Sequence, residues 1–296
     1  MALDAGEFLN PPDSATLARF VRMALDEDAP WGDLTSDSLL RASAQLSANL
    51  VAREAGILAG GGLFLASMQL EDPAMQPALH VRDGERFAAG ALLASVTGSA
   101  RAILKAERVG LNFVQRLSGI ATETARYVAA AAGTKARIAD TRKTTPGLRV
   151  LERYAVRCGG GTNHRFSLSD AVLVKDNHLA AVLAGGTETL TEALKSLRRR
   201  LPHTTHIEVE VDRVEQIEPV LAAGVDTIML DNFSLADLRR GVEQVAGRAL
   251  VEASGGVRLE RIAEIAATGV DVISVGALTH SVRSLDLGLD YAAGEP

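Results

Sequence analysis

Thr227-Ile-Met-Leu-Asp-Asn232 is a short apolar run that ends in polar residues. Similar runs lie on both sides of it, at 136–139, 171–174, 207–211, 249–251 and 270–275. Helix-like segments separate most of them, at 186–200, 213–223, 234–246 and 258–268. This alternation predicts a parallel sheet with helical crossovers. An open doubly wound sheet and an α/β barrel both fit the alternation, which does not choose between them.

Polar or glycine residues follow each of these runs. In a (β/α) barrel the carboxyl ends of the strands form one rim, where catalytic groups lie. We therefore expect a common site that contains Arg142, Lys143, Lys175, Glu210, Asp231 and Ser254. Glu208 and Glu210 alternate with valines, so both point to the same side of their strand. A buried carboxylate there requires a cation or a metal nearby.

Charges of opposite sign occupy different parts of this region. The early strands and loops supply cations, namely Arg142, Lys143, Arg149, His164, Arg165 and Lys175. The middle strands supply the carboxylates Glu210 and Asp231, which suit a divalent metal or a developing positive charge. The late strands supply Gly255, Gly256 and Gly276, which are typical of a phosphate-binding loop. The pattern predicts an anionic substrate and a phosphorylated one.

Other motifs have a structural and a functional interpretation. Gly159-Gly160-Gly161 fits a flexible loop, but the adjacent Asn163-His164-Arg165 favours an anion-binding loop. Glu107-Arg108 and Glu152-Arg153 are interpreted as surface ion pairs.

The first 132 residues lack the strand–helix alternation seen after residue 135. A capped amphipathic helix is predicted over 13–27 and a loop over 27–36. A small sheet is predicted from runs at 46–52, 56–59, 80–81 and 92–96, with a helix near 61–69. One or two long helices are predicted over 101–132.

Bulk composition excludes several classes of protein. The 296 residues carry a formal net charge of −6, which disfavours general binding to nucleic acid. Cys158 is the only cysteine, so no intrachain disulfide is expected and a reducing cytoplasm is the natural setting. No secretory signal and no apolar stretch of about 18 residues is apparent in the sequence, so we expect no membrane span.

Long ordered motifs closely resemble the quinolinate phosphoribosyltransferases, or carboxylating nicotinate-nucleotide pyrophosphorylases. They include Asp140-Thr-Arg-Lys-Thr-Thr-Pro-Gly-Leu-Arg149, Gly159-Gly-Gly-Thr-Asn-His-Arg165, Lys175-Asp-Asn-His178, Glu208-Val-Glu-Val-Asp212, Met229-Leu-Asp-Asn-Phe233 and Glu252-Ala-Ser-Gly-Gly256. The likeness runs from about residue 27 to 281. One departure is Ser167, where the family usually has glycine.

The resemblance implies an N-terminal open α/β sandwich domain and an incomplete (β/α) barrel with a phosphate site at its carboxyl strand ends. We expect the first domain at 1–115, joined by a C-terminal segment at about 280–296, and the barrel at 116–279. The implied reaction joins quinolinate to phosphoribosyl pyrophosphate (PRPP) with Mg²⁺, giving nicotinate mononucleotide, pyrophosphate and carbon dioxide for NAD biosynthesis. The implied working unit is a homodimer with shared active sites.

The resemblance also implies a role for each matching residue. Arg142, His164, Arg165 and Lys175 would bind the quinolinate carboxylates, with Arg108 arriving from the neighbouring subunit. Lys143 would approach the ribose phosphate or the pyrophosphate, while Glu210 and Asp231 would face the ribose hydroxyls and Mg²⁺. Ser254, Gly255, Gly256 and Gly276 would hold the 5′-phosphate. The expected catalytic residues are Lys143, Lys175, Glu210 and Asp231.

Three alternatives fit parts of the sequence. A paralogous group found with molybdate-transport genes shares the fold, but its Lys-Asp-Asn-His segment is altered, whereas residues 175–178 are intact here. A strand-end lysine such as Lys175 also occurs in Schiff-base lyases. A non-catalytic PRPP sensor is the third alternative, and the intact Glu210, Asp231 and cation set argue against it.

Overall fold

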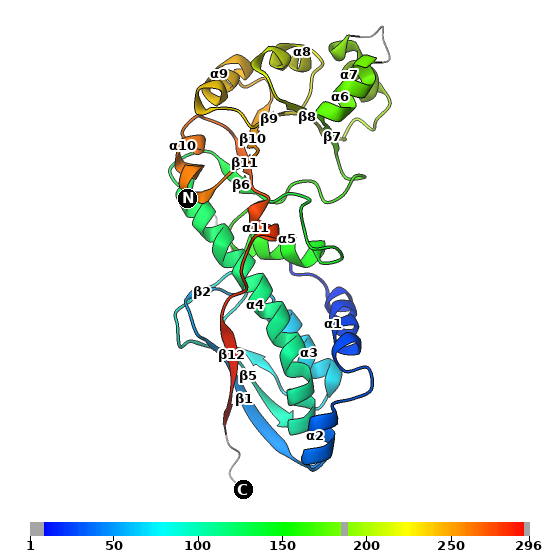
Figure 1. Ribbon diagram of the computed structural model, residues 1–296, viewed down its shortest axis with the longest axis vertical. Coiled ribbons are helices and arrows are strands. Elements are labelled where there is room, and N and C mark those ends of the chain that lie inside the picture. The colour runs from blue at the N-terminus through cyan, green and yellow to red at the C-terminus, as the bar shows by residue number, and fades with distance from the viewer. Residues whose placement is uncertain (1–8, 185–188, 293–296) are drawn as a thin grey trace. The chain divides into compact units, whose positions relative to one another are not determined.

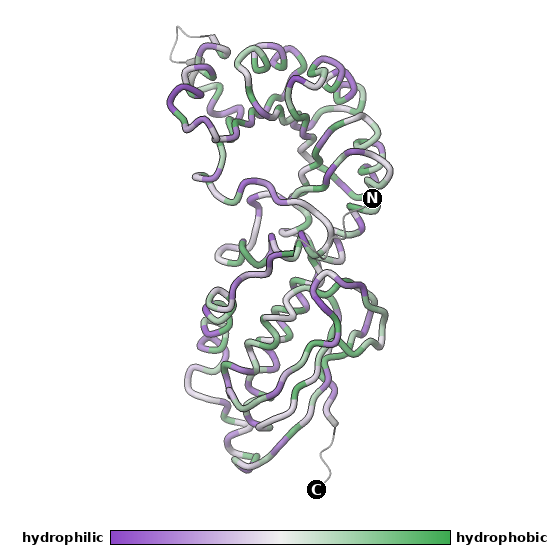
Figure 2. The backbone as a smooth tube through the Cα atoms, turned by 180° about the vertical axis from the view of Figure 1, so that it is seen from behind, coloured by the Kyte–Doolittle hydropathy of each residue, from purple (hydrophilic) through white to green (hydrophobic). Residues whose placement is uncertain are grey.

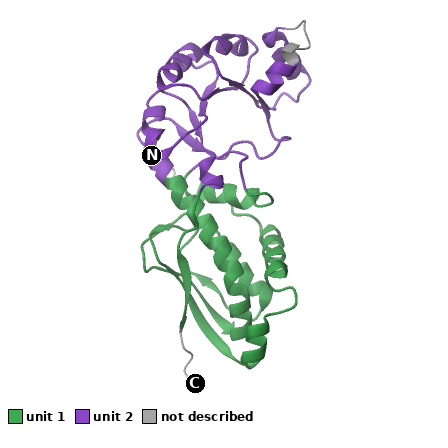
Figure 3. Cartoon of the chain, viewed as in Figure 1, with its two compact units in different colours: residues 1–125, 145–160, 282–296 green, residues 126–144, 161–281 purple. Residues whose placement is uncertain are grey.

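The computed structural model describes residues 9–184 and 189–292 and divides the chain into two compact units (Figure 3). Unit 1 comprises residues 1–125, 145–160 and 282–296, and unit 2 comprises residues 126–144 and 161–281. The division expected at 115/116 falls inside one continuous helix, and residues 145–160, expected in the barrel, group with unit 1. The predicted boundaries therefore differ from the compact units.

Unit 1 is built on a four-stranded antiparallel sheet. Its order is β12 (Leu287–Ala292), β1 (Gln45–Ala52), β5 (Leu92–Ser99) and β3 (Ala78–Leu79). A separate pair joins β2 (Gly56–Ile57) to β4 (Arg86–Phe87). Leu50 of β1 pairs with Leu289 on one side and Ala94 on the other, so the C-terminal strand completes a sheet begun near the start of the chain.

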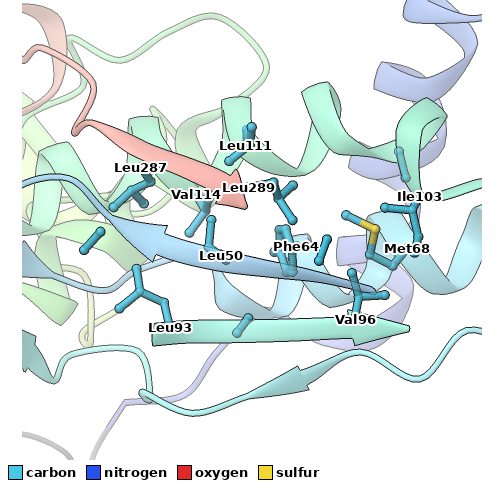
Figure 4. Packing of buried hydrophobic residues seen from close by; sticks show 14 of the residues in the cluster. Leu50, Phe64, Met68, Leu93, Val96, Ile103, Leu111, Val114, Leu287 and Leu289 are labelled. Atoms are coloured by element: carbon cyan, nitrogen blue, oxygen red, sulfur yellow. The ribbon is translucent and has the colours of Figure 1, made fainter. Parts of the chain in front are cut away.

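Helices α3 (Gly61–Glu71) and α4 (Ala100–Ala130, whose end enters unit 2) lie on one face of this sheet (Figure 1). The other helices of unit 1 are α1 (Ser14–Asp28), which packs against α3, α2 (Leu34–Leu39) and α5 (Arg149–Cys158). Leu50 from β1, Phe64 from α3 and Ile103 from α4 are fully buried in one cluster (Figure 4). Burial of each such side chain contributes about 1.5–3 kcal/mol, so this cluster stabilises the layer of helices on the sheet.

Two local predictions for unit 1 were wrong. Residues 27–36 were expected as a loop, but α2 begins at Leu34 because the Asp33 carboxylate accepts hydrogen bonds from the backbone N–H groups of Thr35 and Ser36. The strand expected at 80–81 lies at Ala78–Leu79 instead. The rest of the predicted small sheet and the long helix after residue 100 are present.

Unit 2 contains six strands whose neighbouring pairs are all parallel. They are β6 (Arg137–Ala139), β7 (Val172–Val174), β8 (Ile207–Val211), β9 (Thr227–Asp231), β10 (Leu250–Ser254) and β11 (Val272–Ser274), in the order β6-β11-β10-β9-β8-β7. β6 and β7 end the order and are not paired with each other. The sheet is an incomplete barrel, as the resemblance to the family implied, whereas the strand–helix alternation alone left an open doubly wound sheet possible.

Helices lie on the outer side of these strands (Figure 1). They are α6 (Asp176–Ala184), α7 (Leu190–Arg199), α8 (Ile217–Leu221), α9 (Leu235–Val245) and α10 (Ile262–Ala266), with 3-10 turns η2 (Val214–Gln216) before α8 and η3 (Leu259–Arg261) before α10. The short helix α11 (Ala277–His280) follows the carboxyl end of β11. The predicted helix 186–200 begins in residues outside the described part of the chain. The outer helices alternate between hydrophobic and hydrophilic along their length, as expected for helices with one buried face (Figure 2). Within the described residues, no helix combines the length and apolar character needed to cross a membrane.

Candidate active site

A cavity of about 770 Å³ lies in unit 2 at the carboxyl ends of the strands. That volume is in the range of small-molecule sites. Most of the predicted site residues line it, namely Arg142, Lys143, His164, Arg165, Lys175, Glu210, Asp231, Ser254, Gly255, Gly256 and Gly276. Arg149, which was predicted among the cations, begins α5 in unit 1 and does not line the cavity. Arg108 is exposed on α4 in unit 1. The sequence thus identified one barrel rim from the residue that follows each strand.

Two arginines place positive charge on one side of the cavity. Arg142 follows β6, and Arg165 lies in the loop before β7. Burial, and then the positive charge of Arg142, hold the pKa of Arg165 below its usual range. The Nε atoms of both side chains are buried and have no hydrogen-bond partner among the described residues. Buried donors without partners are costly, so these two guanidinium groups are suited to an incoming anion.

The loop that carries Arg165 is fixed to the edge of the barrel. Thr162 forms a parallel bridge with Ala139 at the end of β6. The fully buried Asp140 carboxylate accepts hydrogen bonds from Asn163 Nδ2 at 2.6 Å and from the backbone N–H of His164 at 2.7 Å. These contacts hold residues 162–165 beside the otherwise open edge of the sheet.

His164 contacts two buried glutamates from different strands. Its Nε2 lies 3.1 Å from Oε2 of Glu208 on β8 and 3.6 Å from Oε1 of Glu252 on β10. Burial alone would lower the pKa of His164, but the hydrogen bonds and negative charges of the glutamates raise it. Burial raises the pKa of Glu208. The glutamates therefore favour a hydrogen on Nε2 of the ring, between His164 and the two carboxylates.

Lys175 and Glu210 form the second charged pair in the cavity. Lys175 follows β7 and its Nζ donates a hydrogen bond of 2.5 Å to Glu210 Oε2 on β8. The sequence predicted a cation or a metal beside the glutamates of β8. In the structure, Glu210 contacts a lysine and Glu208 contacts a histidine. The Glu210 pair is accessible from the cavity, because Lys175 is about half exposed.

Asp231 and the glycine loop after β10 are held together by Asn232. The Asn232 Nδ2 donates to Asp231 Oδ2 at 2.6 Å, and its backbone N–H donates to the carbonyl of Ser254 at 2.9 Å. Gly255 has φ +90°, and a Cβ at this position would lie 2.3 Å from Asn232 Oδ1. Glycine is thus required at 255 both by backbone conformation and by space.

Lys143 lies on the segment after β6 and lines the same cavity. The Thr279 hydroxyl of α11 donates a hydrogen bond of 2.6 Å to the Lys143 carbonyl. A Cβ at Gly276 would lie 3.1 Å from Lys143 Cδ. Close packing of this kind lets the lysine side chain pass over Gly276 into the cavity.

Two expectations for motifs outside the cavity were wrong. A Cβ at Gly159 would lie 2.3 Å from the Ala121 carbonyl, and residues 159–161 do not line the cavity, so this stretch serves close packing against α4 rather than an anion. Glu152 is fully buried in unit 1 and accepts hydrogen bonds from Arg116 and Thr145, so it is not part of a surface pair. Its position on the inner face of α5 could have been found from helical periodicity.

The sequence also left some cavity residues unidentified. Asn232, Arg258 and His280 line the cavity but were given no role. Asn232 directly follows Asp231, which was predicted to lie at a strand end. That position could have identified Asn232 as a residue of the cavity. Arg258 lies beyond the end of β10, and His280 lies beyond the end of β11. Residues this far from a strand end cannot be identified from strand-end position.

The geometry fits a class of protein: a barrel enzyme whose rim carries guanidinium groups suited to an anion, carboxylates suited to a cationic centre, and glycine loops of the kind that bind phosphate. Family models give this class a name. The N-terminal domain of quinolinate phosphoribosyl transferase matches residues 33–118, and its C-terminal domain matches residues 120–290. The chain belongs to the quinolinate phosphoribosyltransferase family.

Individual relatives agree with the family models. The nicotinate-nucleotide pyrophosphorylase [carboxylating] of Mycobacterium leprae is 45% identical over 278 residues, covering 91% of this chain and 95% of the relative. The probable enzyme of that name from Bacillus subtilis is 44% identical over 264 residues and covers 89% of each chain. The solved nicotinate-nucleotide pyrophosphorylase of Francisella tularensis superposes with a TM-score of 0.89 at 36% identity, covering 96% of this chain and 99% of that one.

Proposed function

We propose that the cavity of unit 2 is the active site for the reaction of this family. The chain is a decarboxylating phosphoribosyltransferase of NAD biosynthesis: it transfers the phosphoribosyl group of PRPP to quinolinate and yields nicotinate mononucleotide, pyrophosphate and carbon dioxide. One observation carries the assignment of the cavity. The guanidinium groups of Arg142 and Arg165 line it with buried Nε donors that have no partner among the described residues.

Quinolinate is a dianion, and a dianion needs several fixed cations. In our proposal Arg142, His164, Arg165 and Lys175 form its binding site, since all four line the same cavity. Arginine binds a carboxylate through two parallel hydrogen bonds and so orients the pyridine ring, whereas lysine acts as a point charge. Fixing the ring nitrogen toward the ribose contributes to catalysis through orientation.

The phosphoribosyl substrate occupies the other part of the cavity in this proposal. Ser254, Gly255, Gly256 and Gly276 bind its 5′-phosphate, and Lys143 binds the ribose phosphate or the pyrophosphate. Glu210 and Asp231 face the ribose hydroxyls. Their carboxylate oxygens also fit Mg²⁺, which takes one or two carboxylates and completes its coordination with water and substrate phosphates. A bound Mg²⁺ would neutralise charge on the pyrophosphate.

The side chains then act on the charges that the reaction creates. As the bond to pyrophosphate breaks, positive charge develops at the anomeric carbon, and Glu210 and Asp231 stabilise it. Lys143 stabilises the negative charge of the departing pyrophosphate. The ring nitrogen of quinolinate forms the new bond to that carbon and becomes a pyridinium. The pyridinium accepts the electron pair left when the adjacent carboxylate departs as carbon dioxide, and a proton then takes the place of the carboxylate on the ring. Catalytic function is thus proposed for Lys143, Lys175, Glu210 and Asp231.

A homodimer with shared active sites is part of the proposal. Arg108 is exposed in unit 1 and would reach the quinolinate site of a second copy. Trp31, Leu34 and Leu39 of unit 1 are 95%, 85% and 78% exposed, which suits an apolar surface covered by another subunit. A reducing cytoplasm is the proposed location, because Cys158 is a buried free thiol.

The direct test is an assay of purified protein with quinolinate, PRPP and Mg²⁺. We expect equal amounts of nicotinate mononucleotide, pyrophosphate and carbon dioxide. Absence of these products from folded protein would contradict the proposed reaction. Borohydride treatment with a carbonyl substrate separates the lyase alternative, since a covalent label on Lys175 would favour a lyase and its absence supports the transferase.

A further inference from the structure

Two buried glutamates next to the cavity have no role in the proposed reaction. Glu208 on β8 and Glu252 on β10 are each 4% exposed. They come from the two strands that flank β9, and neither lines the cavity. Each has an Oε1 atom that is buried and has no hydrogen-bond partner within residues 9–184 and 189–292. Burying two carboxylates close together raises the free energy of the folded state. We therefore expect an interaction that offsets this cost.

Their shared contact is His164, which does line the cavity. Glu208 Oε2 lies 3.1 Å and Glu252 Oε1 lies 3.6 Å from its Nε2. On the opposite side of the ring, Nδ1 accepts a hydrogen bond of 2.8 Å from the backbone N–H of Arg165. The imidazole is therefore connected through one nitrogen to the glutamates and through the other to the residue that carries a substrate-binding guanidinium.

The hydrogen bond at Nδ1 also determines where the ring carries its hydrogen. An acceptor must have a free lone pair, so Nδ1 is unprotonated and the hydrogen lies on Nε2, toward the glutamates. A ring in this state cannot coordinate a metal through Nε2. Although the three side chains lie close enough together to hold a metal ion, the hydrogen-bond pattern favours a hydrogen-bonded cluster.

We propose that Glu208 and Glu252 are positioning residues, which orient the His164 ring so that Nδ1 fixes the backbone of Arg165 and thereby directs its guanidinium into the cavity. Arg165 is the second fixed point of this arrangement, because its Nη1 donates to the Ala171 carbonyl at 2.8 Å. Asp140 holds the backbone of His164 from the other side. This inference rests on the proposed function at one point, namely that Arg165 binds a carboxylate of quinolinate.

The first test needs no substrate. With ¹⁵N-labelled histidine, the spectrum of a protein with six histidines is simple, and His164→Gln identifies the signal of His164. At neutral pH we expect the Nδ1 of His164 to show the chemical shift of an unprotonated nitrogen and Nε2 that of a protonated one. A protonated Nδ1 would overturn the proposal. This result does not depend on which reaction the protein catalyses, so it separates failure of the inference from failure of the proposed function.

The second test changes one carboxylate at a time without changing its size. Glu208→Gln replaces a charge-assisted hydrogen bond to His164 by a neutral one, and Glu252→Gln removes the negative charge 3.6 Å from the ring. For each variant we expect the KM for quinolinate to rise about tenfold. The KM for PRPP is expected to stay within about twofold, because Arg165 does not bind PRPP in the proposed site. Glu218→Gln is the matched control: it removes an exposed carboxylate of unit 2, paired with Arg248 at 2.8 Å, and both constants should be unchanged.

Three results would contradict the proposal. An equal rise in both KM values would indicate general damage to the cavity, and an unchanged KM for quinolinate would show that the glutamates do not position Arg165. Stoichiometric binding of Zn²⁺ to the unmodified protein that is abolished by Glu252→Gln would show that the cluster is a metal site. If either variant does not fold, the tautomer of His164 in the unmodified protein still decides the question.

Discussion

At the scale of single residues, the cavity depends on the shape of arginine as well as its charge. Arg165 offers a planar fork whose Nε is buried and unpaired among the described residues. Arg165→Lys keeps the positive charge but removes the fork, so the two parallel hydrogen bonds to a carboxylate cannot form. We expect the KM for quinolinate to rise by about tenfold or more in steady-state assays. An unchanged value would mean that Arg165 acts only as a point charge.

Gly255, directly after β10, packs against Asn232, directly after β9. At Gly255, φ is +90° and a Cβ would lie 2.3 Å from Asn232 Oδ1. Gly255→Ala is therefore expected to displace Asn232 and to raise the KM for PRPP by about tenfold or more, with a loss of about 1–3 kcal/mol in the free energy of unfolding. Both quantities are read from steady-state kinetics and denaturant titration.

Gly247→Ala provides the control for that substitution. Gly247 also has a positive φ, of +74°, but nothing lies within 4 Å of its added Cβ. The variant should share the backbone strain and lose about 1 kcal/mol, with normal kinetics. Equal effects of the two substitutions on KM would show that contact with Asn232 is unimportant.

Much of the candidate site could be predicted at this scale because one physical rule applies to it. Carboxyl ends of parallel strands meet at one rim, so Lys175, Glu210 and Asp231 could be grouped without any knowledge of three-dimensional contacts. Asn232 was not identified, because it acts through hydrogen bonds to Asp231 and Ser254 that have no sequence signature. The contact of His164 with both glutamates requires three segments to meet, which spacing alone does not reveal.

At the scale of elements, a buried ion pair attaches α5 to α4 in unit 1. Glu152 is 0% exposed and accepts hydrogen bonds from Arg116, while its other contacts fix Thr145. Glu152→Ala would leave the Arg116 charge without this partner, so we expect a loss of about 3–5 kcal/mol in the free energy of unfolding. Urea denaturation measures it. Glu218→Ala removes an exposed pair and should cost about 0–1 kcal/mol. Similar losses for both would contradict the importance of burial.

Elements with strong apolar patterns were predicted more accurately than short capped ones. The run at 207–211 coincides with β8, because its alternation of valine and glutamate is typical of a strand. α2 was missed because it has six residues and depends on the Asp33 side chain rather than on periodicity. The two-residue strand β3 is determined by its pairing with β5, and a pairing partner is not visible in a local pattern.

At the scale of the whole molecule, shared active sites predict complementation between subunits. Arg108→Ala and Lys143→Ala should each abolish activity, since we propose that one residue serves the neighbour's site and the other its own. In mixed dimers one site carries both substitutions and the other carries neither, so mixing should restore part of the activity. Assays after subunit exchange measure this recovery. Complete exchange without recovery would contradict the shared site.

The pairing of β12 with β1 has a consequence for how the protein is made. Unit 1 begins with the first strands of the chain, but the strand at one edge of its sheet is residues 287–292. A ribosome therefore completes all of the barrel strands before it supplies the last strand of the earlier unit. Domains generally fold as units during synthesis, so the barrel can form while the chain is still attached. The N-terminal sheet keeps β1 unpaired on one edge until residues 287–292 have been synthesised and have left the exit tunnel. A premature stop codon before residue 287 would therefore damage the part of the protein that is synthesised first.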